Sequence, residues 1–150
     1  MPGTLTHSPA DVMRWLLIDM GHGTDPATEP LGLWPAYAGG EPATPDEVIT
    51  VYDTAGVIDG FTMTDGEAQE RHGIQIRVRS ATHRRGYNKS RAIAVALDQD
   101  VYQETVTIDG TAYLVWTATR TTDVLAIGKE SPTSKRSIFT LNALVSMRQN

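Results

Sequence analysis

Two fragments of this sequence contain residues that could act as nucleophiles or as general acids and bases. The fragment Asp53-Thr54-Ala55-Gly56 places a carboxylate in a turn-forming segment, as in the aspartic protease loop, where the carboxylate activates water. That loop requires glycine directly after threonine so that the backbone can approach the catalytic carboxylate, and here Ala55 intervenes. A plain turn at the end of a strand is the simpler interpretation, because Asp and Gly are ordinary turn residues.

The second fragment, Arg71-His72-Gly73, matches the core of the histidine phosphatase motif, in which histidine is the nucleophile and arginines hold the phosphate. That motif follows a strand and needs a second, distant histidine, whereas this fragment precedes a predicted strand and His83 is close in sequence. We therefore interpret it as a surface loop. A hydrolase that uses Asp53 or His72 is kept as the alternative to a non-catalytic function.

No recognisable set of residues predicts a nucleotide or metal site. Gly128-Lys129-Glu130-Ser131 departs from a phosphate-binding P-loop, because Asp123 stands where the first glycine belongs and Glu130 replaces the magnesium-binding hydroxyl. The four histidines lack paired helical spacing, and the absence of cysteine excludes thiolate zinc sites, disulfides and cysteine nucleophiles. We expect no catalytic residue, no cofactor and no metal.

Charge is distributed unevenly along the chain. The segment 71–91 contains seven of the thirteen basic residues and no acidic residue, although the whole chain carries a formal charge of -5. A charge run of this kind is usually a solvated face. Alternatively, a basic flank of one subunit contacts an acidic flank of the next, as a head-to-tail contact in a closed ring permits. Because aromatic residues are sparse in the run, we expect it to contact protein and not nucleic acid.

The helices that position these residues can be predicted from the hydrophobic period. Ser8-Pro9-Ala10-Asp11 begins a helix that Gly21 ends, with Ser8 as the N-cap and Pro9 in the first turn. Its inner side is expected to carry Val12, Trp15, Leu16 and Asp19. A second helix over 83–98 is expected to bury a face made of Tyr87, Ser90, Ile93, Ala94 and Leu97. The proline- and glycine-rich segment 21–45 predicts a long loop anchored by Leu31, Leu33 and Trp34.

A period of two predicts strands at 48–52, 74–79 and 139–147. In the second of these, one face is apolar and enters a core, while the other contacts water or a partner through Gln75, Arg77 and Arg79. Between the first two strands, the segment 53–72 predicts a protruding hairpin or a mobile loop. We expect one α+β domain spanning residues 1–150, with a mostly antiparallel sheet of four to five strands and both helices on one face.

Asp109-Gly110 lies between two β-rich runs and predicts a two-residue type I′ hairpin. The turn would pair Ile108 with Thr111, Val106 with Tyr113 and Glu104 with Val115. The opposite face carries residues too apolar to be left wholly in water, so we expect something to cover it. These residues are Thr105, Thr107, Ala112, Leu114 and Trp116.

The order of these elements, from Ser8 to Arg148, resembles the tail terminator and minor capsid proteins of long-tailed, non-contractile bacteriophages. The resemblance lies in an apolar first helix, an alanine-rich second helix and four strands, which begin at Val48, Gly73, Thr105 and Ile138. It implies a small subunit that forms a hexameric ring on the last ring of the tail tube, stops its polymerisation and offers the opposite surface to head-completion proteins of the neck. DNA would pass through the lumen without specific binding. A neck or head-closure protein of similar fold is the alternative within this class.

The resemblance also implies a location in the virion, at the junction of tail and neck, after assembly in the host cytoplasm. We expect no membrane segment, because the apolar stretch 13–20 is short and is interrupted by Arg14 and Asp19. At the subunit interface we expect the basic residues Arg79, Arg84, Arg85 and Lys89 to face acidic residues of the neighbour, with apolar burial around Leu114 and Trp116. The acidic candidates are Asp46, Glu47, Asp65, Glu67 and Glu70. The segment 53–72 is expected to be mobile in the free subunit and to become ordered on assembly.

Overall fold

The computed structural model describes the backbone of residues 5–61 and 68–150, and the side chains of these residues except 58–61 and 68–70. Helix α1 (Pro9–Asp19) begins as predicted, because the Ser8 hydroxyl accepts a hydrogen bond from the Asp11 N–H at 3.2 Å. It ends at Asp19 with Met20 as the C-cap, and Gly21 then takes a φ of +84°, which prevents the helix from continuing. The buried face includes Met13 and Leu17 in addition to the predicted Val12 and Leu16, while Asp19 is exposed.

Helix α2 (His83–Gln99) begins after Thr82, whose hydroxyl caps the Arg85 N–H at 3.3 Å. Four of the five residues predicted for its buried face are buried, and Tyr87 is the exception, with 45% of its surface exposed. Gly86 is buried instead, because the helix approaches the ring of Phe139 at this position. No helix of the described residues is long and apolar enough to cross a membrane.

The described residues form a seven-stranded mixed sheet, which is larger than the four to five strands predicted. Its strands are β1 (Ala36–Ala38), β2 (Val48–Phe61), β3 (Ala68–Ser80), β4 (Tyr102–Ile108), β5 (Thr111–Arg120), β6 (Leu125–Lys129) and β7 (Ser137–Gln149). The order is β1-β2-β3-β7-β5-β4, with β6 paired to the free half of β7. Strand β1 runs parallel to β2, and the other named pairs are antiparallel.

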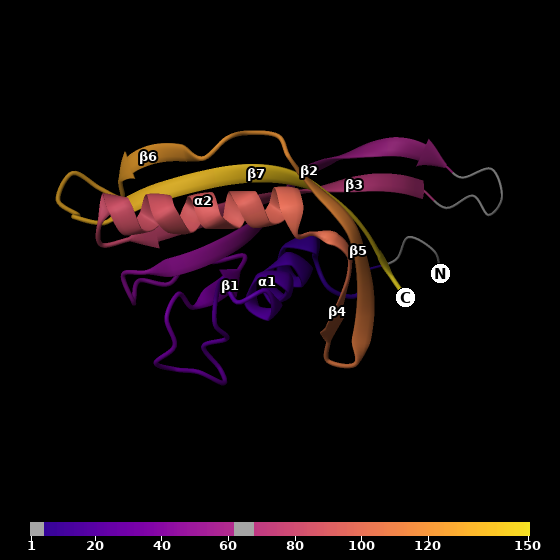
Figure 1. The fold of residues 1–150 in the computed structure, drawn as a ribbon, viewed down its shortest axis with the longest axis horizontal. Coiled ribbons are helices and arrows are strands. Elements are labelled where there is room, and N and C mark those ends of the chain that lie inside the picture. Colours follow the sequence, from indigo (N-terminus) through magenta and orange to yellow (C-terminus); the bar gives the residue numbers. More distant parts are fainter. Residues whose placement is uncertain (1–4, 62–67) are drawn as a thin grey trace.

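Residues that face each other across neighbouring strands lie on the same side of the sheet. Ile76 on β3 faces Val51 on β2 and Leu141 on β7, and all three belong to the core that also contains the buried residues of both helices. The two helices therefore pack on one face, as predicted, and the sheet curls around them as a half-barrel (Figure 1). We call the face toward the helices the inner face and the opposite one the outer face.

In the described residues of the segment 53–72, the two strands remain paired and form a protruding arm, which agrees with the hairpin prediction. Strands β2 and β3 remain paired as far as Phe61 and Ala68, with register shifts after Thr54 and Ile58. In Figure 1 the outer ends of these strands project from the body at the right. Residues 62–67 lie outside the described residues, so the expectation of mobility and ordering on assembly stays a prediction.

The segment 21–45 is a loop as predicted, apart from β1 and a bridge between Thr24 and Pro35. The anchors differ from the prediction. Trp34 packs against the core, but Leu31 is 97% exposed and Leu33 is 81% exposed. The loop is held instead by its backbone, since the Thr24 N–H donates to the Trp34 carbonyl at 3.1 Å and the Ala36 N–H donates to the Thr24 carbonyl at 2.9 Å.

Candidate subunit interface

The basic run 71–91 does not form one surface. On β3, Arg77 and Arg79 alternate with the core residues Ile76 and Val78 and therefore lie on the outer face. Arg71 also lies on β3, whereas Arg84, Arg85, Lys89 and Arg91 lie on α2, which packs on the inner face. The sheet thus separates two groups of positive charge that are continuous in sequence.

Arg79 is buried inside its own subunit, with 1% of its side chain exposed. Its Nη2 donates to the Pro45 carbonyl at 2.6 Å and its Nε to the Asp46 carbonyl at 3.3 Å. Its Nη1 contacts Glu41 at 3.1 Å and Glu130 at 3.6 Å. The prediction that this face of β3 contacts water or a partner is therefore wrong at Arg79, because two loops of the same chain cover it.

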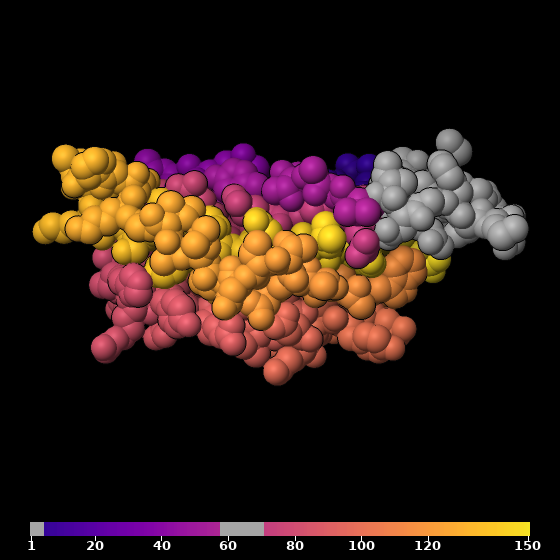
Figure 2. All heavy atoms as spheres, turned by 90° about the horizontal axis from the view of Figure 1, so that it is seen from above, coloured from indigo at the N-terminus to yellow at the C-terminus, as the bar shows by residue number. Residues whose placement is uncertain are grey.

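These loops are joined by an outer ion cluster, which consists of Glu41, Asp46, Arg77, Arg79, Glu130 and Arg136. Arg136 donates to Glu130 at 2.7 Å and to the Ala43 carbonyl at 2.6 Å, so the loop before β7 is tied to the loop before β2. Seen from above, the gold segment near residue 130 lies beside the purple segment near residue 45 (Figure 2). Burial raises the pKa of the Glu130 carboxyl, but Arg136 and Arg79 outweigh it, and the pKa lies below its ordinary value.

The basic residues of α2 have different surroundings. Arg84 is exposed and makes no ion pair within the part of the chain that the structure describes. Arg85 is 70% exposed and contacts Glu47 of the same subunit at 3.1 Å. Lys89 donates to the His22 carbonyl at 3.1 Å, its Nζ lies 5.3 Å from the centre of the Trp34 ring, and burial lowers its pKa. Glu47, proposed from sequence for the neighbouring subunit, thus has a partner within its own chain.

An apolar groove of about 720 Å³ lies between the loop 30–35 and the N-terminal half of α2. The loop contributes Leu31, Leu33 and Trp34, and the helix contributes the basic side chains of Arg85 and Lys89. Sequence reasoning missed this groove because it treated the two leucines as anchors. Their isolation within a proline-rich loop, without a helical or strand period, was the available signal.

The β4–β5 hairpin has the predicted pairing, including Val106 with Tyr113. Its outer face is partly covered by the same chain, because the Arg148 guanidinium lies 5.4 Å from the centre of the Trp116 ring. Leu114 faces Arg148 across β5 and β7, and both Leu114 and Trp116 remain partly exposed. Of the acidic candidates, Asp46 joins the outer ion cluster. Asp65 and Glu67 lie outside the described residues, and Glu70 is described only by its backbone on β3.

The two hydrolase candidates line one shallow pocket of about 380 Å³, since Thr54 on β2 pairs with Gly73 on β3. Asp53 and His72 are thus neighbours, which their sequence spacing does not reveal. The Asp53 carboxylate accepts a hydrogen bond from the Ala10 N–H at 2.9 Å, in the first turn of α1. Because the first N–H groups of a helix have no intrahelical acceptor, this contact gives Asp53 a structural role as a helix cap from a distant strand.

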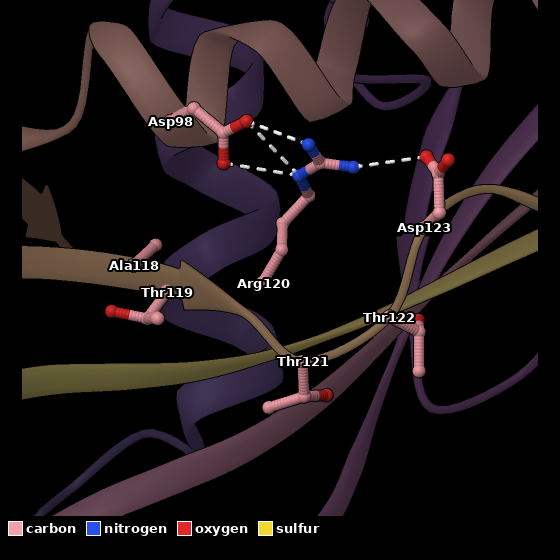
Figure 3. Close-up of a pocket in the computed structure, with 7 residues that line it drawn as sticks. All are labelled: Asp98, Ala118, Thr119, Arg120, Thr121, Thr122 and Asp123. Carbon is pink, nitrogen blue, oxygen red and sulfur yellow. Dashed lines mark hydrogen bonds and ion pairs between the residues drawn. The ribbon is translucent and has the colours of Figure 1, made fainter.

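A second shallow pocket, of about 560 Å³, surrounds Arg120 (Figure 3). Its guanidinium donates to both oxygens of Asp98, at 3.0 and 2.7 Å, and to Asp123 at 3.2 Å. The hydrogen bond from Arg120 is the main cause that holds the pKa of Asp98 below its ordinary value. These contacts hold α2 against the end of β5. The guanidinium of Arg120 thus binds carboxylates of its own chain. The described residues contain no group of His, Asp or Glu that could hold a metal ion.

A family model matches most of this chain. Residues 16–130 match the family model described as bacteriophage tail terminator protein. Among solved structures, a chain of the virion of a native gene transfer agent particle is similar at 14% identity and a TM-score of 0.39, with 77% of this chain and 78% of that chain covered. No curated protein matches this sequence.

Proposed function

Since this chain belongs to the bacteriophage tail terminator family, we propose that its subunits close into a hexameric ring that caps the head-proximal end of a phage tail tube. Membership in the family makes the chain a structural virion protein and not an enzyme. The proposed ring stops polymerisation of the tube and presents its opposite surface to the head-completion proteins of the neck. The observation that carries the proposal is the family match, which covers most of the chain.

The surface of the subunit supports assembly into a larger structure. Apolar side chains are exposed in several places, including Leu31 and Leu33 at the groove and Leu125 and Ile127 on β6. All five residues of β6 are exposed, although the strand is paired to β7. Exposed apolar surface of this kind is typical of protein interaction sites. Different patches on one subunit favour head-to-tail contacts, which generate a ring when the rotation between subunits closes.

On the basic side of the proposed contact between subunits lie Arg84, Arg85 and Lys89. Burial of Leu114 and Trp116 adds apolar contact. Arg79 is no longer a candidate for this contact, because its partners belong to its own chain. The acidic side of the proposed contact is the arm, through Asp65, Glu67 and Glu70. The net charge of -5 supports a lumen through which DNA passes without specific binding.

A tail terminator and a neck or head-closure protein differ in what they bind. A neck or head-closure protein would bind filled heads, whereas a tail terminator would cap purified tail tubes. The hydrolase alternative finds no support, since Asp53 caps α1 and the family is structural.

The test is electron microscopy of the purified protein alone and mixed with tail tubes, together with restoration of infectivity in a phage that lacks the gene. We expect rings at one end of each tube and a tail length that no longer grows. Binding to filled heads with bare tube ends would favour the neck alternative.

A further inference from the structure

The groove between loop 30–35 and α2 exposes leucines on a backbone that is held in place. The loop is fixed around them, because Trp34 packs against the core and the Gly32 N–H donates to the Glu29 carbonyl at 3.0 Å. Lys89 also lies over the Trp34 ring. Leu31 and Leu33 therefore point outward from an ordered segment, and their exposure leaves apolar surface in water that a partner could cover.

The rim of the groove is basic. Arg85 and Lys89 line it, and Arg84 precedes them on the same helix without an ion pair in the described residues. Glu47, which contacts Arg85, is the acidic side chain among the lining residues that the structure describes. Charge of this sign selects an acidic occupant that also carries apolar side chains.

The sequence of the arm has that composition. Its outer part, residues 57–70, contains four acidic residues and no basic residue, and it also contains Val57, Ile58, Phe61 and Met63. The acidic residues are Asp59, Asp65, Glu67 and Glu70.

The two surfaces lie at opposite ends of the subunit. In Figure 1 the outer ends of β2 and β3 project at the right, whereas the loop that carries the groove lies below the left half of α2. An arm that projects away from the groove of its own chain is placed to reach the groove of another, which is a head-to-tail contact.

We propose that the groove of one subunit binds the acidic arm of a second copy of this chain, with the arm's apolar side chains against Leu31 and Leu33 and its carboxylates near Arg85. The inference rests on the proposed ring and names the two surfaces that close it.

Cysteine crosslinking tests the contact directly, because the chain has no cysteine of its own. Leu33→Cys is combined in one chain with Phe61→Cys or with Met63→Cys, and the assembled ring is oxidised and run on a non-reducing gel. We expect a ladder of covalently joined subunits from at least one double variant. Each single variant and the pair Leu125→Cys with Met63→Cys should give no ladder.

The outcomes separate this contact from the proposed function. One set of outcomes is that rings form normally but give no ladder at either arm position, or give an equal ladder with Leu125→Cys. Either result would overturn the proposed contact between arm and groove and leave the proposed ring intact. Subunits that remain monomeric with wild-type sequence, alone and with tail tubes, would overturn the ring and this contact together.

A second measurement uses the exposure of the leucines. Replacing Leu31 and Leu33 together with Ala should leave the melting temperature unchanged, because neither side chain packs in the subunit. Association measured by light scattering should weaken by at least about tenfold, since a buried leucine contributes enough for such a factor. Tyr102→Ala, at an exposed apolar position on β4 that does not line the groove, is the matched control and should keep wild-type association. Equal association of the double variant and the control would contradict the proposal.

Discussion

Several charged side chains of this protein contact residues of the same chain that are far away in sequence. Local sequence patterns do not predict these contacts. Arg79 contacts Glu41 and Glu130, and Arg120 contacts Asp98. In each case a charged residue on a strand meets a carboxylate from a separate loop or helix. The alternation of β3 correctly predicts that Arg79 lies on the outer face, but it does not predict the two loops that cover that face. The buried ion pairs of Arg79 fix the position of two loops more than they add stability, because desolvation offsets much of the attraction.

Gly86 sets the distance between α2 and the sheet. A Cβ at this position would lie 2.5 Å from Cε2 of Phe139 and 2.8 Å from its Cδ2, and Phe139 is fully buried. We expect Gly86→Ala to destabilise the subunit by up to about 2 kcal/mol, since overpacking costs about 1–3 kcal/mol and the gain in helix propensity offsets roughly 1 kcal/mol of it. Urea unfolding measures the difference. Asn88→Ala, at an exposed position of the same helix, should not destabilise. A Gly86→Ala variant as stable as Asn88→Ala would show that the helix can shift away from Phe139.

His22 gives stability a dependence on pH. Burial, and then the nearby charge of Lys89, lowers its pKa below the ordinary value of 6.5. His22 therefore binds a proton more readily in the unfolded chain than in the folded chain. Its contribution to stability is fully present above about pH 6.5 and is lost as the pH falls toward the pKa of the folded state. Asp98 has a lowered pKa, so its contribution is lost only below its ordinary value of 3.8. We expect urea unfolding at about pH 7.5 and about pH 5 to show a loss in the wild type that His22→Gln lacks. An equal loss in both proteins would assign the effect to other groups.

At the level of elements, the sequence predicts best where a local rule is strong. Ser8 caps α1, and Asp109-Gly110 turns the β4–β5 hairpin in the predicted register. Strands β1 and β6 were missed for physical reasons. The first has three residues inside a proline-rich loop, and the second is exposed on both faces, so it lacks the apolar-polar alternation that identifies a strand. The parallel pairing of β1 with β2 depends on the path of the loop, which no local pattern specifies.

The hairpin turn offers a test of the register. Asp109 has a φ of 48° and Gly110 a φ of 82°, as a type I′ turn requires. We expect Gly110→Val to cost about 1–3 kcal/mol, because a β-branched residue is strained at positive φ. Asp109→Asn is the control, since asparagine tolerates this region, and it should melt close to wild type. An unchanged melting temperature for Gly110→Val would mean that the turn relaxes at no cost.

At the level of the whole molecule, the order of elements in the sequence was enough to identify the family and to place both helices on one face of the sheet. It was not enough to locate the interface. The run of basic residues is continuous in sequence, but the sheet separates Arg79, in the outer ion cluster, from Arg85 and Lys89 at the rim of the groove. The candidate interface could be found only after Arg79 was seen to be buried and Leu31 and Leu33 were seen to be exposed.

The proposed ring should depend on the charges that remain exposed on α2. Arg84 has no ion pair in the described residues, and the Arg85 pair with Glu47 is largely solvated, so both guanidinium groups are available to an acidic neighbour. Exposed pairs contribute only about 0–1 kcal/mol each, so we expect the joint reversal of Arg84 and Arg85 to Glu to weaken the ring about tenfold or more and not to unfold the subunit. Raising salt should weaken the wild-type ring as well, because exposed charges are screened over about 8 Å at physiological ionic strength.

Native mass spectrometry or light scattering across a salt series measures both effects. Arg91→Glu is the matched control, because Arg91 lies on the same helix, contacts Asp123 at 3.4 Å and does not line the groove. Arg79 is unsuitable for this test, since its replacement would disturb the loops that it holds. A ring that is indifferent to salt, and equally indifferent to reversal at Arg84 and Arg85, would show that the basic face of α2 is solvated. The apolar contacts at the groove and at Leu114 and Trp116 would then have to close the ring without electrostatic help.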